Sequence, residues 1–149
     1  MKKRTVLISA CLLGVSCRYD GGEKLHPLAP MLAQSCHLVP VCPEQLGGLP
    51  TPRAPSERRG EWVVTADGRD VTEAYHRGAE ETLRLAQLYG CTAAVLKEKS
   101  PSCGCGRIYD GTFTGTLRPG DGVTAELLKE HGIPVLGESG LEQLVEHLI

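Results

Sequence analysis

The 149-residue sequence has few aromatic residues, no long apolar segment and almost no net charge. It contains one Trp and one Phe, too few for a surface of stacked aromatics that binds single-stranded nucleic acid. The formal net charge of -2 gives no basic footprint for nucleic acid or for an anionic membrane. No apolar run approaches the roughly 20 residues that span a bilayer. Neither nucleic acid nor a membrane is therefore the expected partner, and no feature of the sequence predicts an oligomeric state.

Seven cysteines are an odd number, and too few for a disulfide scaffold in a chain of this length. The sequence also lacks a C-x-x-C pair and a spaced pair of histidines, which excludes the usual zinc ribbons and fingers. In a cytosolic chain, cysteines are more often metal ligands or catalytic thiols than structural bridges. The thiols are therefore the first candidates for chemistry.

The N-terminal segment has lysines and an arginine before a short apolar run, as a secretion signal or a lipoprotein cleavage box does. The run is too short for either, and it leads directly into a pattern typical of a first core strand. A cytoplasmic protein is therefore the expectation.

Strand and helix patterns alternate along the chain. Short apolar runs predict buried strands at 4–9, 38–42, 92–97 and 134–136. Apolar spacing and end signals predict helices at 27–36, 72–89 and 123–131, and a last helix opened by a capping box at Ser139 and Glu142. Strands that alternate with helices form βαβ units. The sequence therefore predicts an α/β fold: a single Rossmann-like, three-layer domain over residues 1–149 with a four-stranded, mainly parallel sheet.

Three segments fall outside this alternation. Residues 43–60 are rich in Pro and Gly and are expected to be irregular, and a loop of that length is usually functional or disordered. Next, residues 62–65 and 69–71 flank Asp67-Gly68, which predicts a small hairpin with a primed turn. Residues 108–117 alternate in polarity and predict a second hairpin lying over the site.

The loop at residues 97–106 carries the largest group of candidate reactive side chains. It follows a buried strand, Pro101 forbids a helix before it, and its glycines allow tight turns. The loop carries two thiols and two hydroxyls, those of Cys103, Cys105, Ser100 and Ser102. Cys11 and Cys42 also follow predicted strands. Because open α/β sheets hold ligands at the carboxyl ends of their strands, three strand ends with cysteines predict one shared site.

Soft thiolates from separate loops suit an iron–sulfur cluster or zinc. A cluster with three cysteine ligands leaves one iron open, and an open coordination position is what a Lewis-acid catalyst needs. Glu44 lies two residues after Cys42, which makes its carboxylate a candidate general base beside the metal.

Three further polar residues have two interpretations each. Ser100 and Ser102 could donate or relay a proton, or could satisfy loop amides. Arg53 could bind an anionic group of the substrate, or could pin the Pro-rich loop by a salt bridge. We take Ser102 and Arg53 as candidate substrate-binding residues, and Glu44 and Ser100 as candidate catalytic residues.

Several motifs together resemble one family. They are Ser9-Ala-Cys-Leu-Leu-Gly14, Cys17-Arg-Tyr-Asp-Gly21, Cys42-Pro-Glu44, Gly47-Gly-Leu49, Pro52-Arg53, Lys97-Glu-Lys-Ser-Pro-Ser-Cys-Gly104 and Ile108-Tyr-Asp-Gly111. Their joint occurrence in this order, over nearly the whole chain, is similar to the small bacterial family, long known as a domain of unknown function, that includes the thiouracil desulfidases.

The resemblance implies a 4Fe–4S cluster held by Cys11, Cys42 and Cys103, with one open iron. It also implies a non-redox desulfuration in which that iron takes the sulfur of a thiolated pyrimidine, Glu44 activates water and Ser100 assists proton transfer. Cys105 lies outside the family pattern, so which thiol of the Cys103/Cys105 pair is the ligand stays open. Cys17 lies inside the pattern, but we do not expect it to be a ligand.

Two other functions remain as alternatives. One is a zinc-stabilised binding module whose thiolates are structural. The other is a thiol-redox or sulfur-carrier protein that uses Cys103 and Cys105 as a disulfide pair. Protein colour and metal content separate these from an iron–sulfur enzyme.

Overall fold

A computed structural model describes residues 3–148 of the chain. Its central element is a four-stranded sheet in the order β2-β1-β5-β8, in which every neighbouring pair is parallel. The strands are β1 (Arg4–Ser9), β2 (Cys36–Val41), β5 (Ala93–Leu96) and β8 (Val135–Gly137). The predicted α/β class is confirmed, and the sheet is parallel throughout.

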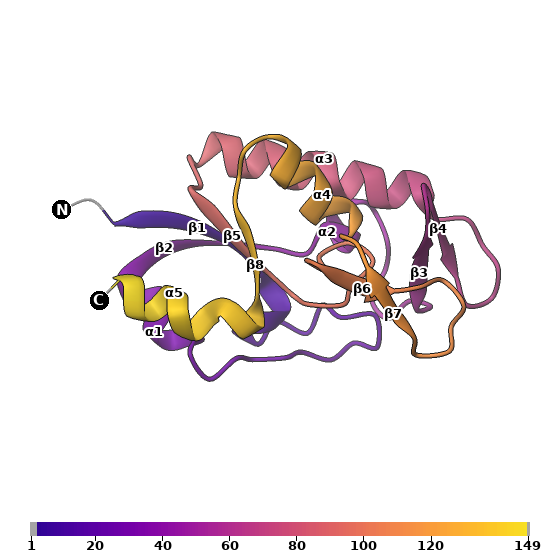
Figure 1. The fold of residues 1–149 in the computed structure, drawn as a ribbon, viewed down its shortest axis with the longest axis horizontal. Coiled ribbons are helices and arrows are strands. Elements are labelled where there is room, and N and C mark those ends of the chain that lie inside the picture. The colour runs from indigo at the N-terminus through magenta and orange to yellow at the C-terminus, as the bar shows by residue number, and fades with distance from the viewer. Residues whose placement is uncertain (1–2, 149) are drawn as a thin grey trace.

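Helices cover both faces of the sheet (Figure 1). One face carries α1 (Ala29–Ser35) and α5 (Leu141–Leu148), and the other carries α3 (Thr72–Leu88) and α4 (Val123–Glu130). Successive side chains of a strand point to opposite faces. Val6 and Ile8 therefore join one core cluster with Leu32 of α1, whereas Leu7 joins another with Leu128 of α4. These clusters hold the three layers together.

The helix boundaries differ slightly from those that the sequence predicts. The predicted capping box does not start the last helix at Ser139, because residues Glu138–Gly140 form a 3-10 turn and α5 begins at Leu141. The Ser139 hydroxyl instead contacts the Glu98 carboxylate. Within residues 3–148, no helix has the length and apolar character needed to cross a membrane.

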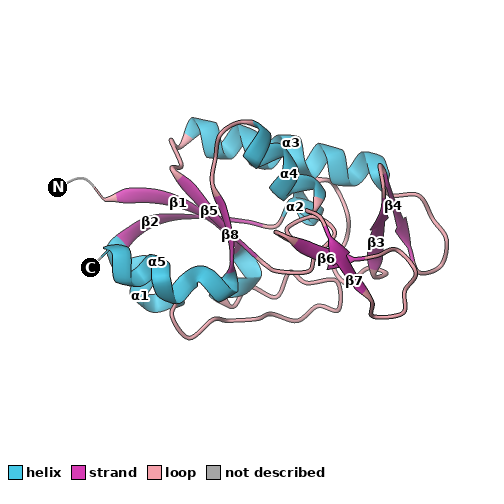
Figure 2. Cartoon of the chain, in the orientation of Figure 1, coloured by secondary structure: helices cyan, strands magenta, loops and turns pink. Residues whose placement is uncertain are grey.

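The strand order reverses between β1 and β5, since β2 follows β1 on one side and β5 and β8 lie on the other. In open α/β sheets, ligands bind outside the carboxyl ends of the strands at such a reversal. The 3-10 turn η1 (Ala10–Leu13) follows β1 at this edge. Figure 2 shows loops gathered between this edge of the sheet and the two small hairpins.

The first hairpin has one of its two predicted strands, at 62–65, but that strand pairs mainly with a different partner. Its β4 (Trp62–Thr65) pairs in antiparallel fashion with β3 (Ser56–Arg59), not with residues 69–71. The predicted pairing is present in a short form: an antiparallel bridge joins Val64 to Asp70, and two backbone N–H groups, those of Thr65 and Val71, donate to the Arg69 and Val63 carbonyl oxygens at 2.8 and 2.9 Å. Since β3 pairs with β4 at four positions, it gives a longer ladder than the segment after Asp67-Gly68 could form. The second hairpin, of β6 (Arg107–Tyr109) and β7 (Leu117–Pro119), overlaps the predicted segment and extends one residue before it and two residues after it.

The segment at 43–60 is more regular than predicted, because it contains β3 and the single helical turn α2 (Pro43–Leu46). The turn α2 packs against the backbone of α3. A Cβ on Gly47 would lie 2.0 Å from the Ala74 carbonyl oxygen, and a Cβ on Gly78 would lie 1.9 Å from the Pro43 carbonyl oxygen. Only glycine permits this approach, so two glycines fix where α2 lies.

We expect Gly78→Ala to lower the free energy of unfolding by about 2 kcal/mol, because the added methyl group forces α2 and α3 apart. Chemical denaturation measures this loss. Gly140→Ala is the matched control, since its Cβ would meet its nearest neighbour at 3.6 Å, an ordinary contact. Equal stability of the two variants would contradict the close packing of α2 on α3.

Candidate functional site

A cavity of about 480 Å³ lies at the carboxyl edge of the sheet and is walled partly by residues of both hairpins. Three thiols line it: Cys11 from the turn after β1, Cys42 directly after β2, and Cys103 from the loop after β5. The volume falls in the range of small-molecule sites, roughly 300–1,000 Å³. The structure thus brings together the thiols of three separate strand ends, as the sequence predicts.

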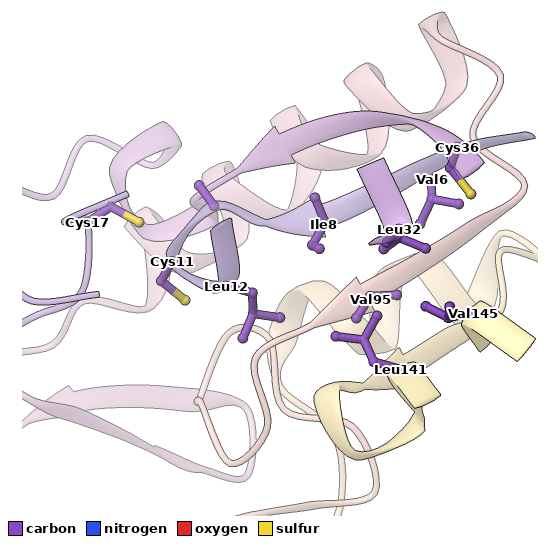
Figure 3. Packing of buried hydrophobic residues seen from close by; sticks show 11 residues of the cluster. Val6, Ile8, Cys11, Leu12, Cys17, Leu32, Cys36, Val95, Leu141 and Val145 are labelled. Atoms are coloured by element: carbon purple, nitrogen blue, oxygen red, sulfur yellow. The ribbon is translucent and has the colours of Figure 1, made fainter. Parts of the chain in front are cut away.

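A fourth thiol, that of Cys17, also lines the cavity. Figure 3 shows Cys11 and Cys17 at one end of a core cluster and Cys36 at the other, so Cys36 is remote from the site. A hydrogen bond with the Cys11 thiol raises the pKa of Cys17. A hydrogen bond with Cys17, together with burial, raises the pKa of the Cys42 thiol. Cys42 Sγ also donates a hydrogen bond to the Cys17 carbonyl oxygen at 3.6 Å, so Cys17 lies beside the candidate ligands.

The structure distinguishes Cys103 from Cys105. Cys103 is buried in the cavity wall, and this burial raises its pKa to about 12. Cys105 lies outside the wall, and its Sγ donates a hydrogen bond to the Val135 carbonyl oxygen at 3.4 Å. Both are free thiols. Of the two thiols, that of Cys103 is therefore the one placed to bind a group in this cavity.

Glu44 lines the same cavity from the first turn of α2. Its Oε1 accepts hydrogen bonds from the Tyr75 hydroxyl at 2.6 Å and from Arg53 Nε at 3.2 Å. Burial, with the neighbouring Glu44 carboxylate, raises the pKa of Tyr75, so this hydroxyl stays protonated as a donor. The sequence places Tyr75 on the buried face of a helix but does not predict its partner. Two donors therefore fix the carboxylate in the wall of the cavity that the thiols line.

Arg53 has a side chain that is only 6% exposed. Its guanidinium donates to the Cys17 carbonyl oxygen at 2.9 Å and to Thr51 Oγ1 at 2.9 Å, and it lies 3.9 Å from Cys42 Sγ. Burial opposes its charge, but the adjacent Glu44 carboxylate raises the pKa of Arg53 overall. Of its two predicted roles, these contacts favour pinning the loop through a salt bridge.

The two loop serines lie in different surroundings. Ser100 lines the cavity, and its Oγ accepts the backbone N–H groups of Ser102 at 3.1 Å and Cys103 at 3.0 Å. These bonds use its acceptor capacity and leave its proton available to a partner in the cavity. Ser102 is fully buried outside the cavity wall, with its hydroxyl 2.9 Å from that of Thr124. The structure does not place Ser102 among the residues that line this cavity.

The donor set fits an iron–sulfur cluster. In residues 3–148, no three His, Cys, Asp or Glu side chains converge closely enough to hold a single metal ion. The thiolates of a cluster bind different irons and need not converge on one point. The raised pKa values of Cys42 and Cys103 keep these thiols protonated until a cation balances the thiolate charge. Three thiols around one cavity, two of them buried and that of Cys42 half-buried, are thus suited to a multi-iron group.

A model of the 2-thiouracil desulfurase family matches residues 6–140. The chain belongs to this family. Another protein similar to the chain is the uncharacterised YbbK of Bacillus subtilis (strain 168), 43% identical over 150 residues, which cover 94% of this chain and 99% of YbbK.

Among solved structures, the 4Fe-4S-dependent thiouracil desulfidase TudS resembles this chain with a TM-score of 0.92. The two are 48% identical, and the match covers 98% of each. The predicted α/β fold and the resemblance to the 2-thiouracil desulfurase family are therefore both confirmed.

Proposed function

We propose that this protein removes the sulfur of a small thiolated pyrimidine, such as 2-thiouracil, with the help of a 4Fe–4S cluster. Water supplies the oxygen that replaces the sulfur. The thiocarbonyl compound and water become the oxo compound and hydrogen sulfide, so no electrons are gained or lost. The observation that supports the proposal is that one cavity is lined by three thiols and a carboxylate, those of Cys11, Cys42, Cys103 and Glu44.

Cys11, Cys42 and Cys103 would hold the cluster. Three thiolates leave one of four irons without a protein ligand, and such an iron supplies a Lewis acid with affinity for the substrate sulfur. The guanidinium of Arg53, 3.9 Å from Cys42 Sγ, places a positive charge beside a thiolate ligand. This charge favours the thiolate form that binding requires.

Glu44 is the group we assign as general base. Its Oε1 is held by Tyr75 and Arg53, so the carboxylate is fixed before a substrate enters. From this position it would take a proton from the water that attacks the thiocarbonyl carbon. Arg53 then acts as a positioning residue for Glu44.

Ser100 is the group we assign to the second proton transfer. Its oxygen is held by two loop amides, and its proton can be donated into the cavity. A hydroxyl in this position assists the departure of sulfur by supplying or relaying a proton.

Anaerobic reconstitution with iron and sulfide tests the proposal. We expect about four iron and four sulfide per chain, and release of sulfide and uracil from 2-thiouracil. The same chain loaded with zinc is the control and should release neither product. A reconstituted protein that holds the cluster but leaves 2-thiouracil intact would contradict the proposed reaction.

A further inference from the structure

Besides the wall that carries the thiols, the cavity has a second wall, which includes two aromatic side chains. It is formed by Tyr109 and Phe113 of the second hairpin and by Glu57 of β3. Phe113 is the only phenylalanine of the chain. None of the three hydrophobic clusters formed by the described residues includes it, although its ring is half-buried. Core packing therefore does not explain its place.

The backbone of Phe113 is in the left-handed region, with φ of 58°. This conformation is rare for a bulky side chain and persists only where the surroundings impose it. In residues 3–148, one other non-glycine residue has a positive φ, Lys99, and it lines the same cavity. Strained residues that gather at one cavity are typical of a ligand site.

Glu57 imposes this conformation. The residue is 9% exposed, and its Oε1 accepts hydrogen bonds from the backbone N–H groups of Gly111 at 2.9 Å and Phe113 at 3.1 Å. Arg59 adds a second anchor, since its Nε donates to the Gly111 carbonyl oxygen at 2.7 Å. The Arg59 guanidinium also lies over the Phe113 ring, 5.9 Å from its centroid. Two charged residues of the first hairpin thus hold the loop of the second.

We infer that Phe113 is a substrate-contacting residue, whose ring holds a planar heterocycle against the thiol wall, and that Glu57 positions it. An aromatic face binds a flat base by stacking whatever its substituents are, so Phe113 supplies affinity while the thiol side supplies reactivity. The identity of the heterocycle as a thiolated pyrimidine rests on the proposed function.

Phe113→Gly is the decisive variant, because glycine adopts the same backbone without strain and removes only the ring. We expect KM for 2-thiouracil to rise about 10-fold, the effect of losing one stacked base. The value of kcat should change much less, iron content should be unchanged, and the Tm should not fall. Tyr89→Leu, at an exposed aromatic beyond α3, is the control and should leave KM unchanged.

Glu57 is tested by its own pair of variants. Glu57→Ala leaves the two loop amides without their acceptor, so we expect the same rise in KM as for Phe113→Gly. Glu57→Gln keeps an oxygen at this position and should restore most of the affinity. An unchanged KM in Glu57→Ala would overturn the positioning role.

Binding measurements separate this inference from the reaction itself. Equilibrium dialysis of 2-thiouracil in the Glu44→Gln background, where the ligand is not consumed, compares the Kd with and without the Phe113→Gly substitution. If Glu44→Gln binds 2-thiouracil more tightly than the double variant, but the wild type does not desulfurate it, the proposed reaction is wrong and the binding role stands. If both variants bind it equally, or neither does, the role of Phe113 is overturned.

Discussion

Replacing Cys11, Cys42 or Cys103 with serine is expected to abolish assembly of the iron–sulfur cluster. Each thiol comes from a different strand end, so none can substitute for another. A serine hydroxyl is a hard and weakly acidic donor, whereas the cluster requires soft thiolates. Iron per chain after anaerobic reconstitution should fall from about four to background, and sulfide release from 2-thiouracil should fall below detection.

Cys105→Ser is the matched control, because Cys105 is two residues from Cys103 but lies outside the cavity wall. This variant should keep its iron and its activity. Retention of the cluster in Cys103→Ser with loss in Cys105→Ser would reverse the assignment of the pair. It would also mean that the loop after β5 turns its other thiol into the cavity when iron is bound.

The sheet and its thiol edge could be predicted because their signals are local. The apolar runs around Leu7 and Val95 are buried in any parallel sheet, and a cysteine directly after such a run must lie at the carboxyl edge. Since all carboxyl ends of a parallel sheet lie along one edge, strand assignment alone brings Cys11 and Cys42 together, and Cys103 reaches the same edge on the loop after β5.

The segment at 43–60 could not be predicted because its order depends on distant partners. Helix α2 is one turn long, and its stability comes from contact with the α3 backbone at Gly78, which no local pattern reveals. The β3 sequence Ser-Glu-Arg-Arg has no apolar alternation. It forms a strand because β4 offers a complete antiparallel partner and because the Glu57 carboxylate binds the loop at Gly111.

The directions of several side chains also could not be predicted from the sequence. Ser100 and Ser102 flank one proline, and nothing in the sequence indicates which of them faces the cavity. In the structure, only Ser100 lines it. The difference is set by Thr124 on α4, whose hydroxyl pairs with Ser102 in the core. In the same way, the Tyr75 ring is predictable as a buried side chain, whereas its bond to Glu44 depends on how α2 packs.

Glu44→Gln is expected to retain the cluster and to lose about 10²–10⁴-fold in the rate of sulfide release, the usual contribution of a general base. The amide has nearly the shape of the carboxylate and can still accept a hydrogen bond from Tyr75. It cannot take a proton from water, so the loss should fall on kcat rather than on iron content. Iron, sulfide and steady-state rates with 2-thiouracil, measured on the same preparation, separate the two effects.

Two further variants show whether the loss belongs to the base itself. Glu61→Gln, at an exposed turn, removes the same charge elsewhere and should leave the rate unchanged. Tyr75→Phe removes one of the two donors to Glu44 Oε1 but keeps the carboxylate, so we expect a smaller loss than in Glu44→Gln. Full activity in Glu44→Gln would exclude its role in water activation. Ser100 would then become the side chain to test, because its hydroxyl lines the same cavity and can still move a proton.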